Sequence, residues 1–442
     1  MSLPTIGFAG MTHLGLVSAA ATAARGFPTV CFDPDPALVA DLRAGRLPVL
    51  EPGLDDLVRG NGDRQSFTAA PGALSACDVV YIAADVPTDD QGRSDIAGIA
   101  ALCATVAAAL APGAVLVVLC QVPPGFTRGL AEPGPERRFY QVETLVFGRA
   151  VERATRPERF ILGCADPAWP LPPALAALLG AFGCPVLPMR YESAELAKIS
   201  INLCLVAAVS TANTLAELCE HVGADWSEIV PALRLDRRIG PHAYLAPGLG
   251  IAGGNLERDL ATVVRLGAAH GTDTGVVRSW LANSRHRRDW AAEALRRTVL
   301  AGTADPLVAV WGLAYKENTR SVKNSPALAT LAQFPEVRFR LHDPAVPASA
   351  ARHPRATDAA DPLAAAAGAE ALMILTPWPD YRTIAPAGIA RALAGRVVID
   401  PYRVLDPAAA SAAGLDHHAL GAPPRLVGAR HAGAGDAAAG KV

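Results

Sequence analysis

A glycine-rich segment near the start of the chain has the residue types that hold a dinucleotide. It reads Gly10-Met11-Thr12-His13-Leu14-Gly15, where a dinucleotide fingerprint would read G-x-G-x-x-G. Thr12 replaces the second glycine, which normally lets the backbone approach the pyrophosphate, but the flanking glycines and a helix start remain. Asp33 ends the next predicted strand, where an acidic residue binds a ribose 2′-hydroxyl and repels a 2′-phosphate. The pattern predicts NAD rather than NADP, bound by Gly10, Thr12, His13, Leu14, Gly15 and Asp33; the alternative is a turn whose glycines serve packing only.

Lys198 and Asn202 suggest electrostatic catalysis. They stand four residues apart in a run without glycine or proline at 192–222, so on a helix both side chains project from one face. There they could meet a single substrate oxygen, and a lysine with a carboxamide stabilises negative charge on oxygen without a nucleophile. A solvated lysine beside an ordinary asparagine is the alternative interpretation.

The elements that must position these residues follow a regular rhythm in the first part of the chain. Strands are expected at 5–8, 29–33, 79–83, 115–119, 159–163 and 185–188. Helices are expected at 13–25, 36–44, 96–110 and 174–181. This alternation predicts a parallel sheet covered by helices on both faces.

The run at 192–222 carries apolar residues near helical spacing and predicts a rod of roughly 45 Å. It fits a helix that links two domains and offers a homodimer surface. More helix is expected to about residue 300, interrupted by a glycine-rich loop at 247–254.

The strand and helix rhythm then restarts. Strands are expected at 307–311, 337–342, 371–375 and 397–400, with a helix at 323–333. The predicted fold class is α/β, with two Rossmann-like doubly wound domains joined by a long central helix. The expected division is 1–190, 191–303 and 304–420, followed by a mobile tail at 421–442.

Composition excludes several classes of protein. Forty Lys+Arg stand against 42 Asp+Glu, so the basic excess that nucleic acid binding needs is missing. The eight cysteines are isolated, without metal-ligand spacing, which indicates a reducing cytoplasm and no structural metal. No Lys or Arg precedes Arg25, and Pro112-Gly113 breaks the uncharged run at 96–127, so neither a signal peptide nor a membrane span is expected.

Nine segments in the same order resemble those of UDP-glucose/GDP-mannose dehydrogenases. They are 48–54 (P-V-L-E-P-G-L), 122–127 (V-P-P-G-F-T), 194–202 (A-E-L-A-K-I-S-I-N), 238–240 (R-I-G), 248–254 (G-L-G-I-A-G-G), 312–316 (G-L-A-Y-K), 325–326 (S-P), 342–344 (H-D-P) and 375–379 (L-T-P-W-P). The resemblance covers about residues 5–407. It implies NAD on the first domain, a nucleotide sugar between that domain and a C-terminal nucleotide-sugar-binding domain, and dimerisation through the long helix.

The sequence departs from this family at its nucleophile. The family takes a sugar CH2OH to a carboxylate with two NAD, through a cysteine in a G-G-x-C-x-P-x-D loop. Here residues 253–259 read G-G-N-L-E-R-D, with Leu256 at the cysteine position and one residue fewer before Asp259. No cysteine follows Cys219 and leucine cannot attack an aldehyde, so the covalent route is closed. Gln121 also stands where the family has a threonine that helps hold a catalytic water.

Other family positions remain, and the resemblance implies their roles. Lys198 and Asn202 match the pair that stabilises the sugar oxyanion, and Asp259 matches the aspartate that with water deprotonates the alcohol. For Asp259 the alternative is an ion pair with Arg258 on a surface helix. Glu143 matches a glutamate of thioester hydrolysis and is expected here only to bind substrate. Expected substrate contacts are Arg238, Gly250, Gly253, Gly254, Leu256, Lys316 and Arg403, and Lys323 replaces an arginine that reaches the cofactor.

Three activities fit these residues. The first is NAD-dependent oxidation of a CH–OH group of a nucleotide sugar without covalent catalysis, by two electrons or by four through a hydrated aldehyde. The second is redox-neutral epimerisation by bound NAD, and the third is non-catalytic binding of a nucleotide sugar or NAD. The retained Lys198, Asn202 and Asp259 favour oxidation, with polysaccharide or glycoside biosynthesis as its setting.

Overall fold

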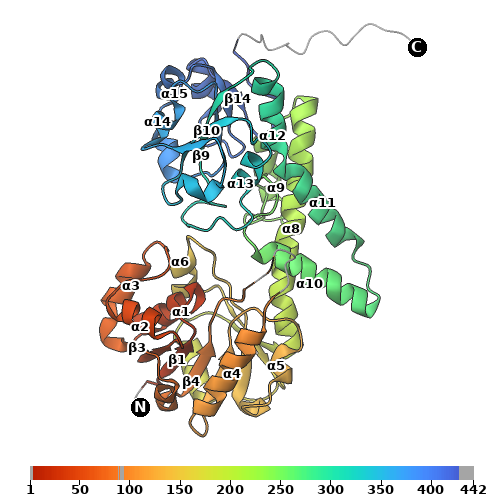
Figure 1. Ribbon diagram of the computed structural model, residues 1–442. Coiled ribbons are helices and arrows are strands. Elements are labelled where there is room, and N and C mark those ends of the chain that lie inside the picture. Colours follow the sequence, from red (N-terminus) through yellow and green to blue (C-terminus); the bar gives the residue numbers. More distant parts are fainter. Residues whose placement is uncertain (1–2, 88, 90–93, 428–442) are drawn as a thin grey trace, which may run out of the picture. The chain divides into compact units, whose positions relative to one another are not determined.

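The computed structural model describes residues 3–87, 89 and 94–427, which form two compact units (Figure 1). Unit 1 comprises the chain up to Cys204 together with Gly254–Val277. Unit 2 comprises Leu205–Gly253 and the chain from Arg278 onward. The division that we predicted into three domains and a tail stays a prediction.

Unit 1 is built on an eight-stranded sheet in the order β3-β2-β1-β4-β5-β6-β7-β8. Its strands are β1 (Ile6–Ala9), β2 (Thr29–Phe32), β3 (Gln65–Thr68), β4 (Val79–Ile82), β5 (Val115–Val118), β6 (Arg138–Gln141), β7 (Phe160–Cys164) and β8 (Val186–Arg190). Neighbouring strands are parallel except β6 and β7, which run antiparallel. The predicted doubly wound sheet is confirmed, and the predicted strands β1, β2, β4 and β5 are parallel as expected. Strands β3 and β6 were not predicted, and β7 and β8 run antiparallel to the other strands.

Unit 1 also contains helices, most of which lie between consecutive strands. They are α1 (His13–Ala24), α2 (Pro36–Arg43), α3 (Leu54–Gly60), α4 (Ala97–Ala109), α5 (Phe126–Gly129), α6 (Ala150–Thr155), α7 (Pro173–Gly180) and α10 (Asn255–His270), with short 3-10 turns at Gly62–Arg64, Pro71–Ala76 and Pro135–Arg137. The central strands β1, β4 and β5 are buried on both faces, which explains their continuous apolar sequences.

Unit 2 repeats the architecture with a fully parallel six-stranded sheet in the order β11-β10-β9-β12-β13-β14. Its strands are β9 (Leu307–Trp311), β10 (Arg338–His342), β11 (Ala356–Asp358), β12 (Ala371–Ile374), β13 (Val397–Ile399) and β14 (Asp416–His418). Its helices are α9 (Trp226–Leu235), α12 (Trp290–Leu295), α13 (Pro326–Leu331), α14 (Pro362–Ala366), α15 (Pro386–Ala392) and α16 (Pro407–Ala412), with a π turn at Arg296–Leu300 and 3-10 turns at Ala348–Ala351 and Pro379–Thr383. Helix α11 (Gly275–Arg288) begins at the end of unit 1. Two Rossmann-like folds are therefore present, as predicted.

Helix α8 (Tyr191–Val222) contributes residues to both units and confirms the predicted long helix. Within the described residues it alone is long and apolar enough to cross a membrane, by length and composition only. It nevertheless buries the charged residues Glu195 and Lys198 within the fold, as expected of a core helix. Leucines at 196, 215 and 218 are exposed along it, and the homodimer stays a prediction.

One predicted helix is shorter than expected, and the first residues of the expected tail make contacts within unit 2. Helix α13 spans Pro326–Leu331 rather than 323–333, because Ser325 caps its start by accepting a hydrogen bond from the Leu328 N–H. The expected tail still makes contacts at its start, since the Gly421 N–H donates to Glu220 at 3.0 Å and Arg425 pairs with His417. The rest of that tail, residues 428–442, lies outside the described residues.

Candidate functional site

The glycine-rich turn between β1 and α1 needs both of its terminal glycines. Gly10 has φ +97°, and a Cβ there would lie 2.6 Å from the Cβ of Ala84. A Cβ on Gly15 would lie 1.8 Å from the carbonyl oxygen of Gly10. Thr12 occupies the N-cap position, yet its side chain does not cap α1; its hydroxyl accepts instead from the Asp85 N–H at 2.9 Å. The first-turn N–H groups of α1 therefore have no side-chain cap, as suits an anion-binding helix start.

Asp33 lies beside this turn, directly after β2. Its Oδ2 accepts from the Met11 N–H at 2.7 Å, and its Oδ1 accepts from the Asp35 N–H at 2.9 Å. The carboxylate is thus fixed next to the uncapped start of α1. This arrangement fits a dinucleotide, with the pyrophosphate at the helix start and a ribose hydroxyl at the carboxylate.

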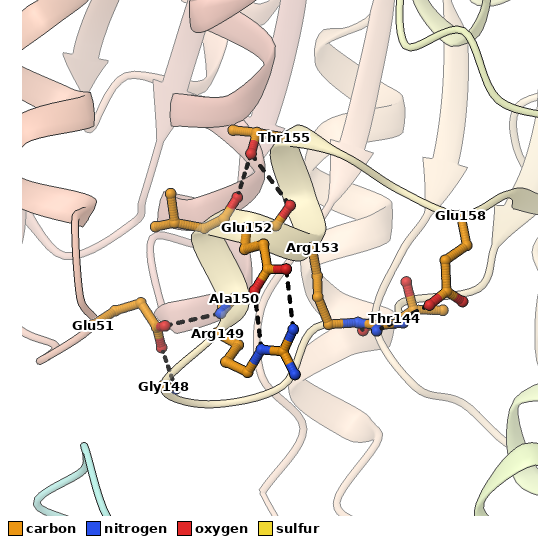
Figure 2. A network of polar contacts seen from close by, with 10 residues as sticks. Glu51, Thr144, Gly148, Arg149, Ala150, Glu152, Arg153, Thr155 and Glu158 are labelled. Carbon is orange, nitrogen blue, oxygen red and sulfur yellow. Dashed lines mark hydrogen bonds and ion pairs between the residues drawn. The ribbon is translucent and has the colours of Figure 1, made fainter. Parts of the chain in front are cut away.

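Glu51 joins α1, the helix that follows the glycine-rich turn, to α6. Our sequence interpretation did not predict this role. The Glu51 carboxylate accepts from the N–H groups of Gly148 at 2.9 Å and Ala150 at 2.8 Å, at the start of α6 (Figure 2). His13 Nε2, in the first turn of α1, lies 2.9 Å from the same carboxylate, and its ring stacks on Phe147. Glu51 belongs to the E-P-G-L segment, but this segment alone does not predict hydrogen-bond partners that lie nearly a hundred residues away in the chain.

The Glu51 contacts predict a stability that depends on pH. Burial raises the pKa of Glu51, but hydrogen bonds from His13, Gly148 and Ala150 outweigh it and lower the pKa. A lowered folded-state pKa stabilises the fold above the unfolded-state pKa, and this contribution disappears as pH falls through the folded-state value. We expect Glu51→Gln to lower the free energy of unfolding at pH 7 by about 1–3 kcal/mol, with a smaller loss at acid pH.

Urea titrations at neutral and acid pH measure this effect. Glu152→Gln is the matched control, because Glu152 is exposed and pairs only with Arg149 in the same network (Figure 2). The control should change stability little. Equal losses for Glu51→Gln at both pH values would contradict the assignment.

Asp259 lies at the centre of the predicted catalytic residues in unit 1. It sits in the second turn of α10 and is 1% exposed. Its Oδ2 accepts from Asn202 Nδ2 at 2.5 Å, and its Oδ1 accepts from the Gln121 amide. Burial raises the pKa of Asp259, while Arg258, Asn202 and Lys198 oppose the shift. A buried carboxylate with a raised pKa suits a general base that works near neutral pH.

Lys198 and Glu143 lie next to this group. Lys198, one helical turn before Asn202 on α8, is 9% exposed, and its Nζ lies 3.1 Å from Glu143 Oε2. The Leu145 N–H donates to the other oxygen of Glu143. The alternative interpretation of a solvated Lys198 is therefore wrong, because the ammonium is held by a buried ion pair.

The alternative for Asp259 was an ion pair with Arg258 on a surface helix. The two side chains do pair, but Arg258 is buried, so the surface placement is wrong. Arg258 is 5% exposed, with its Nε 3.5 Å from Asp259 Oδ1 and its Nη2 donating to the oxygen of the Gln121 amide. Leu256 lies half-buried in the first turn of the same helix. Cys120 precedes Gln121 in the chain, but it is fully buried and burial raises its pKa, so it stays a thiol and does not replace the missing nucleophile.

Glu195 supports this site from α8 and was also missed. Its carboxylate is fully buried and accepts from the N–H groups of Gly125 at 2.6 Å and Thr127 at 2.9 Å. It therefore ties the start of α5 to α8. These hydrogen bonds join the A-E-L-A-K segment to the V-P-P-G-F-T segment.

In unit 2 the loop that carries Gly250 and Gly253 packs tightly against neighbouring residues. Gly250 has φ +71° and a Cβ there would lie 2.3 Å from the Ser284 carbonyl oxygen, while Gly253 has φ +95° and packs on Tyr315. The Gly253 N–H donates to the Lys323 carbonyl at 3.2 Å, so Lys323 supports this loop through its backbone. Gly254 precedes α10 with an extended φ of 176°.

The predicted substrate cations of unit 2 have different surroundings. Arg238 is exposed and pairs with Asp236 at 2.7 Å. Arg403 donates to Asp225 at 2.7 Å and to the Ser227 hydroxyl at 2.8 Å, at the start of α9. Lys316 Nζ lies 5.7 Å from the centre of the Tyr315 ring. The structure does not test their contact with substrate, which stays a prediction.

The chain matches one protein family along most of its length. Residues 4–170, 192–285 and 309–407 match the NAD binding, central and UDP binding domains of the UDP-glucose/GDP-mannose dehydrogenase family. A UDP-glucose 6-dehydrogenase of Pseudomonas aeruginosa is 30% identical over 94% of this chain and 96% of its own. The UDP-glucose 6-dehydrogenase TuaD of Bacillus subtilis is 29% identical over 94% and 92%. A solved UDP-glucose dehydrogenase from Pyrobaculum islandicum superposes with a TM-score of 0.81 at 29% identity, covering 91% of this chain and 95% of its own.

Proposed function

Because the chain belongs to the UDP-glucose/GDP-mannose dehydrogenase family, we propose that it oxidises a CH–OH group of a nucleotide sugar with NAD and without a cysteine nucleophile. The family's NAD binding and UDP binding domains are both present. The observation that carries the proposal is the buried Asp259 carboxylate, which contacts Asn202 and Gln121 beside the Lys198–Glu143 pair.

These residues divide the work of an alcohol oxidation. NAD, when bound, supplies the hydride acceptor. Asp259 takes the hydroxyl proton, directly or through one water, so that the C–H hydride leaves from an alkoxide. Lys198 and Asn202 stabilise the negative oxygen as it forms. Gln121 and Glu143 hold Asp259 and Lys198 in place and bind the sugar.

Leu256 limits how far the oxidation goes. The alcohol step needs a base and an oxyanion clamp, both of which these side chains supply. The aldehyde step needs a tetrahedral adduct that can lose a second hydride, and a leucine cannot form one. That adduct would have to be a hydrate, so we propose two-electron or otherwise non-covalent oxidation.

An assay of NADH formation over a panel of nucleotide sugars tests this function. We expect NADH absorbance to rise with at least one UDP-sugar or GDP-sugar. NAD should support at least about a tenfold higher kcat/KM than NADP, because Asp33 repels a 2′-phosphate. Binding without NADH release or hydride exchange would contradict catalysis, and deuterium exchange into the sugar without net NADH would indicate epimerisation.

Assembly and setting belong to the same proposal. We propose a cytoplasmic homodimer through α8, with polysaccharide or glycoside biosynthesis as its setting and without nucleic acid or membrane partners. The exposed leucines of α8 support the dimer, and the free cysteines fit a reducing compartment. Light scattering at micromolar concentration measures the assembly state.

A further inference from the structure

The Gln121 side chain bridges two consecutive residues of α10. Gln121 lies three residues beyond the end of β5. Its amide nitrogen donates to Asp259 Oδ1, and its amide oxygen accepts from Arg258 Nη2. Asn202, from α8, donates to the second oxygen of Asp259 at 2.5 Å. The base is therefore held by two carboxamides, of which one also contacts a buried guanidinium.

The orientation of the Gln121 amide has a physical cause. The two ends of a carboxamide have nearly the same shape, but one donates hydrogen bonds and the other accepts them. Turned by half a rotation, the oxygen of Gln121 would face the Asp259 carboxylate and its NH2 group would face the guanidinium. Both contacts would then be repulsive. Arg258 on one side and Asp259 on the other therefore select a single orientation.

Resting on the proposed oxidation, we propose that Arg258 is a positioning residue: it holds the Gln121 amide so that the Asp259 carboxylate stays between two N–H donors. This role falls to Arg258 because Gln121 stands where a shorter threonine would be expected. A threonine could not span from the guanidinium to the carboxylate. Arg258 thus acts on the base through Gln121 and, at 3.5 Å, through its own charge.

Other titratable groups face Asp259 as well. Lys198 approaches from α8 and is paired with Glu143, which follows β6. Tyr140 on β6 and Cys120 after β5 are buried, and burial keeps the pKa of each well above its ordinary value, so both stay neutral. Lys198 is thus already paired with another carboxylate. Within the described residues, Arg258 pairs with no carboxylate other than Asp259.

The pH profile of kcat/KM tests the role of Arg258. Hydride transfer needs ionised Asp259, so activity rises with pH through the pKa of this carboxyl. Arg258→Met should move that acid limb to higher pH by about one unit or more, and Arg258→Lys should restore part of the shift. As a single substitution, Gln121→Thr should also move the acid limb to higher pH. Combined with Arg258→Met it should add little, because both substitutions break the same chain of contacts. Arg265→Met, at an exposed arginine on the same helix, is the matched control and should leave the profile unchanged.

A double-mutant cycle measures the same coupling without activity. Arg258→Met should lower the urea midpoint of unfolding more when Asp259 is present than in an Asp259→Asn background, and this difference should shrink at acid pH. An active Arg258→Met enzyme with an unmoved acid limb overturns the inference, as does a cycle without coupling. If the cycle shows coupling but the protein oxidises no nucleotide sugar, the positioning role of Arg258 stands and the proposed function is overturned instead.

Discussion

Lys198→Met is expected to lower kcat for NADH formation by about 10²–10³-fold, since it removes the positive charge that we propose stabilises the developing oxyanion. Methionine keeps an unbranched apolar side chain of similar length, so the packing of α8 should persist. The ammonium lies 3.1 Å from Glu143 and is almost sealed from solvent, so bulk water cannot take its place. The affinity for NAD should not change, because the dinucleotide turn lies on β1 and α1.

Steady-state kinetics and NAD titration by calorimetry separate these two effects. Ser200→Ala is the matched control, since Ser200 is exposed on the same helix and its hydroxyl donates to the Leu196 carbonyl of its own helix. That variant should keep its activity. A Lys198→Met enzyme within threefold of the unaltered kcat would show that the oxyanion is stabilised elsewhere.

The second large effect concerns the number of electrons removed. We expect one NADH per nucleotide sugar in a fast phase, with any second equivalent about 10²-fold slower or more, the contribution of one well-placed catalytic group. The reason is that Leu256 offers no lone pair to hold the aldehyde as an adduct. Water must then add to the aldehyde beside an apolar side chain. The Gln121 amide is already hydrogen-bonded to Asp259 and Arg258.

Single-turnover kinetics with hydroxylamine present check this count. The carbonyl product should be trapped as an oxime and identified by mass spectrometry. Cys120→Ser should leave the stoichiometry unchanged, because that thiol is buried and stays protonated. Two NADH released at matched rates, with no trapped carbonyl, would show that the missing cysteine has been functionally replaced.

The secondary structure could be predicted where local sequence determines it. Strands β1, β4 and β5 are short apolar runs buried on both faces, and α8 has no helix breaker over its 32 residues. Strand β6 was missed because only two of its four residues are apolar, with Arg138 at its start and Gln141 at its end. Both polar side chains make tertiary hydrogen bonds: Arg138 donates to the Leu130 carbonyl, and Gln141 accepts from Tyr81 at 3.0 Å.

The chemistry divides in the same way. The sequence by itself determined that residues 253–259 contain no cysteine, because none follows Cys219, and the proposed oxidation without a thiol rests on this. It also placed Lys198 and Asn202 on one helix face, since their spacing depends only on helical geometry. Only the tertiary structure decided that Arg258 is buried against Gln121 and that Glu51 anchors α6. These contacts join residues about a hundred positions apart or more, and burial and pairing at such separations depend on how the whole sheet and its helices pack.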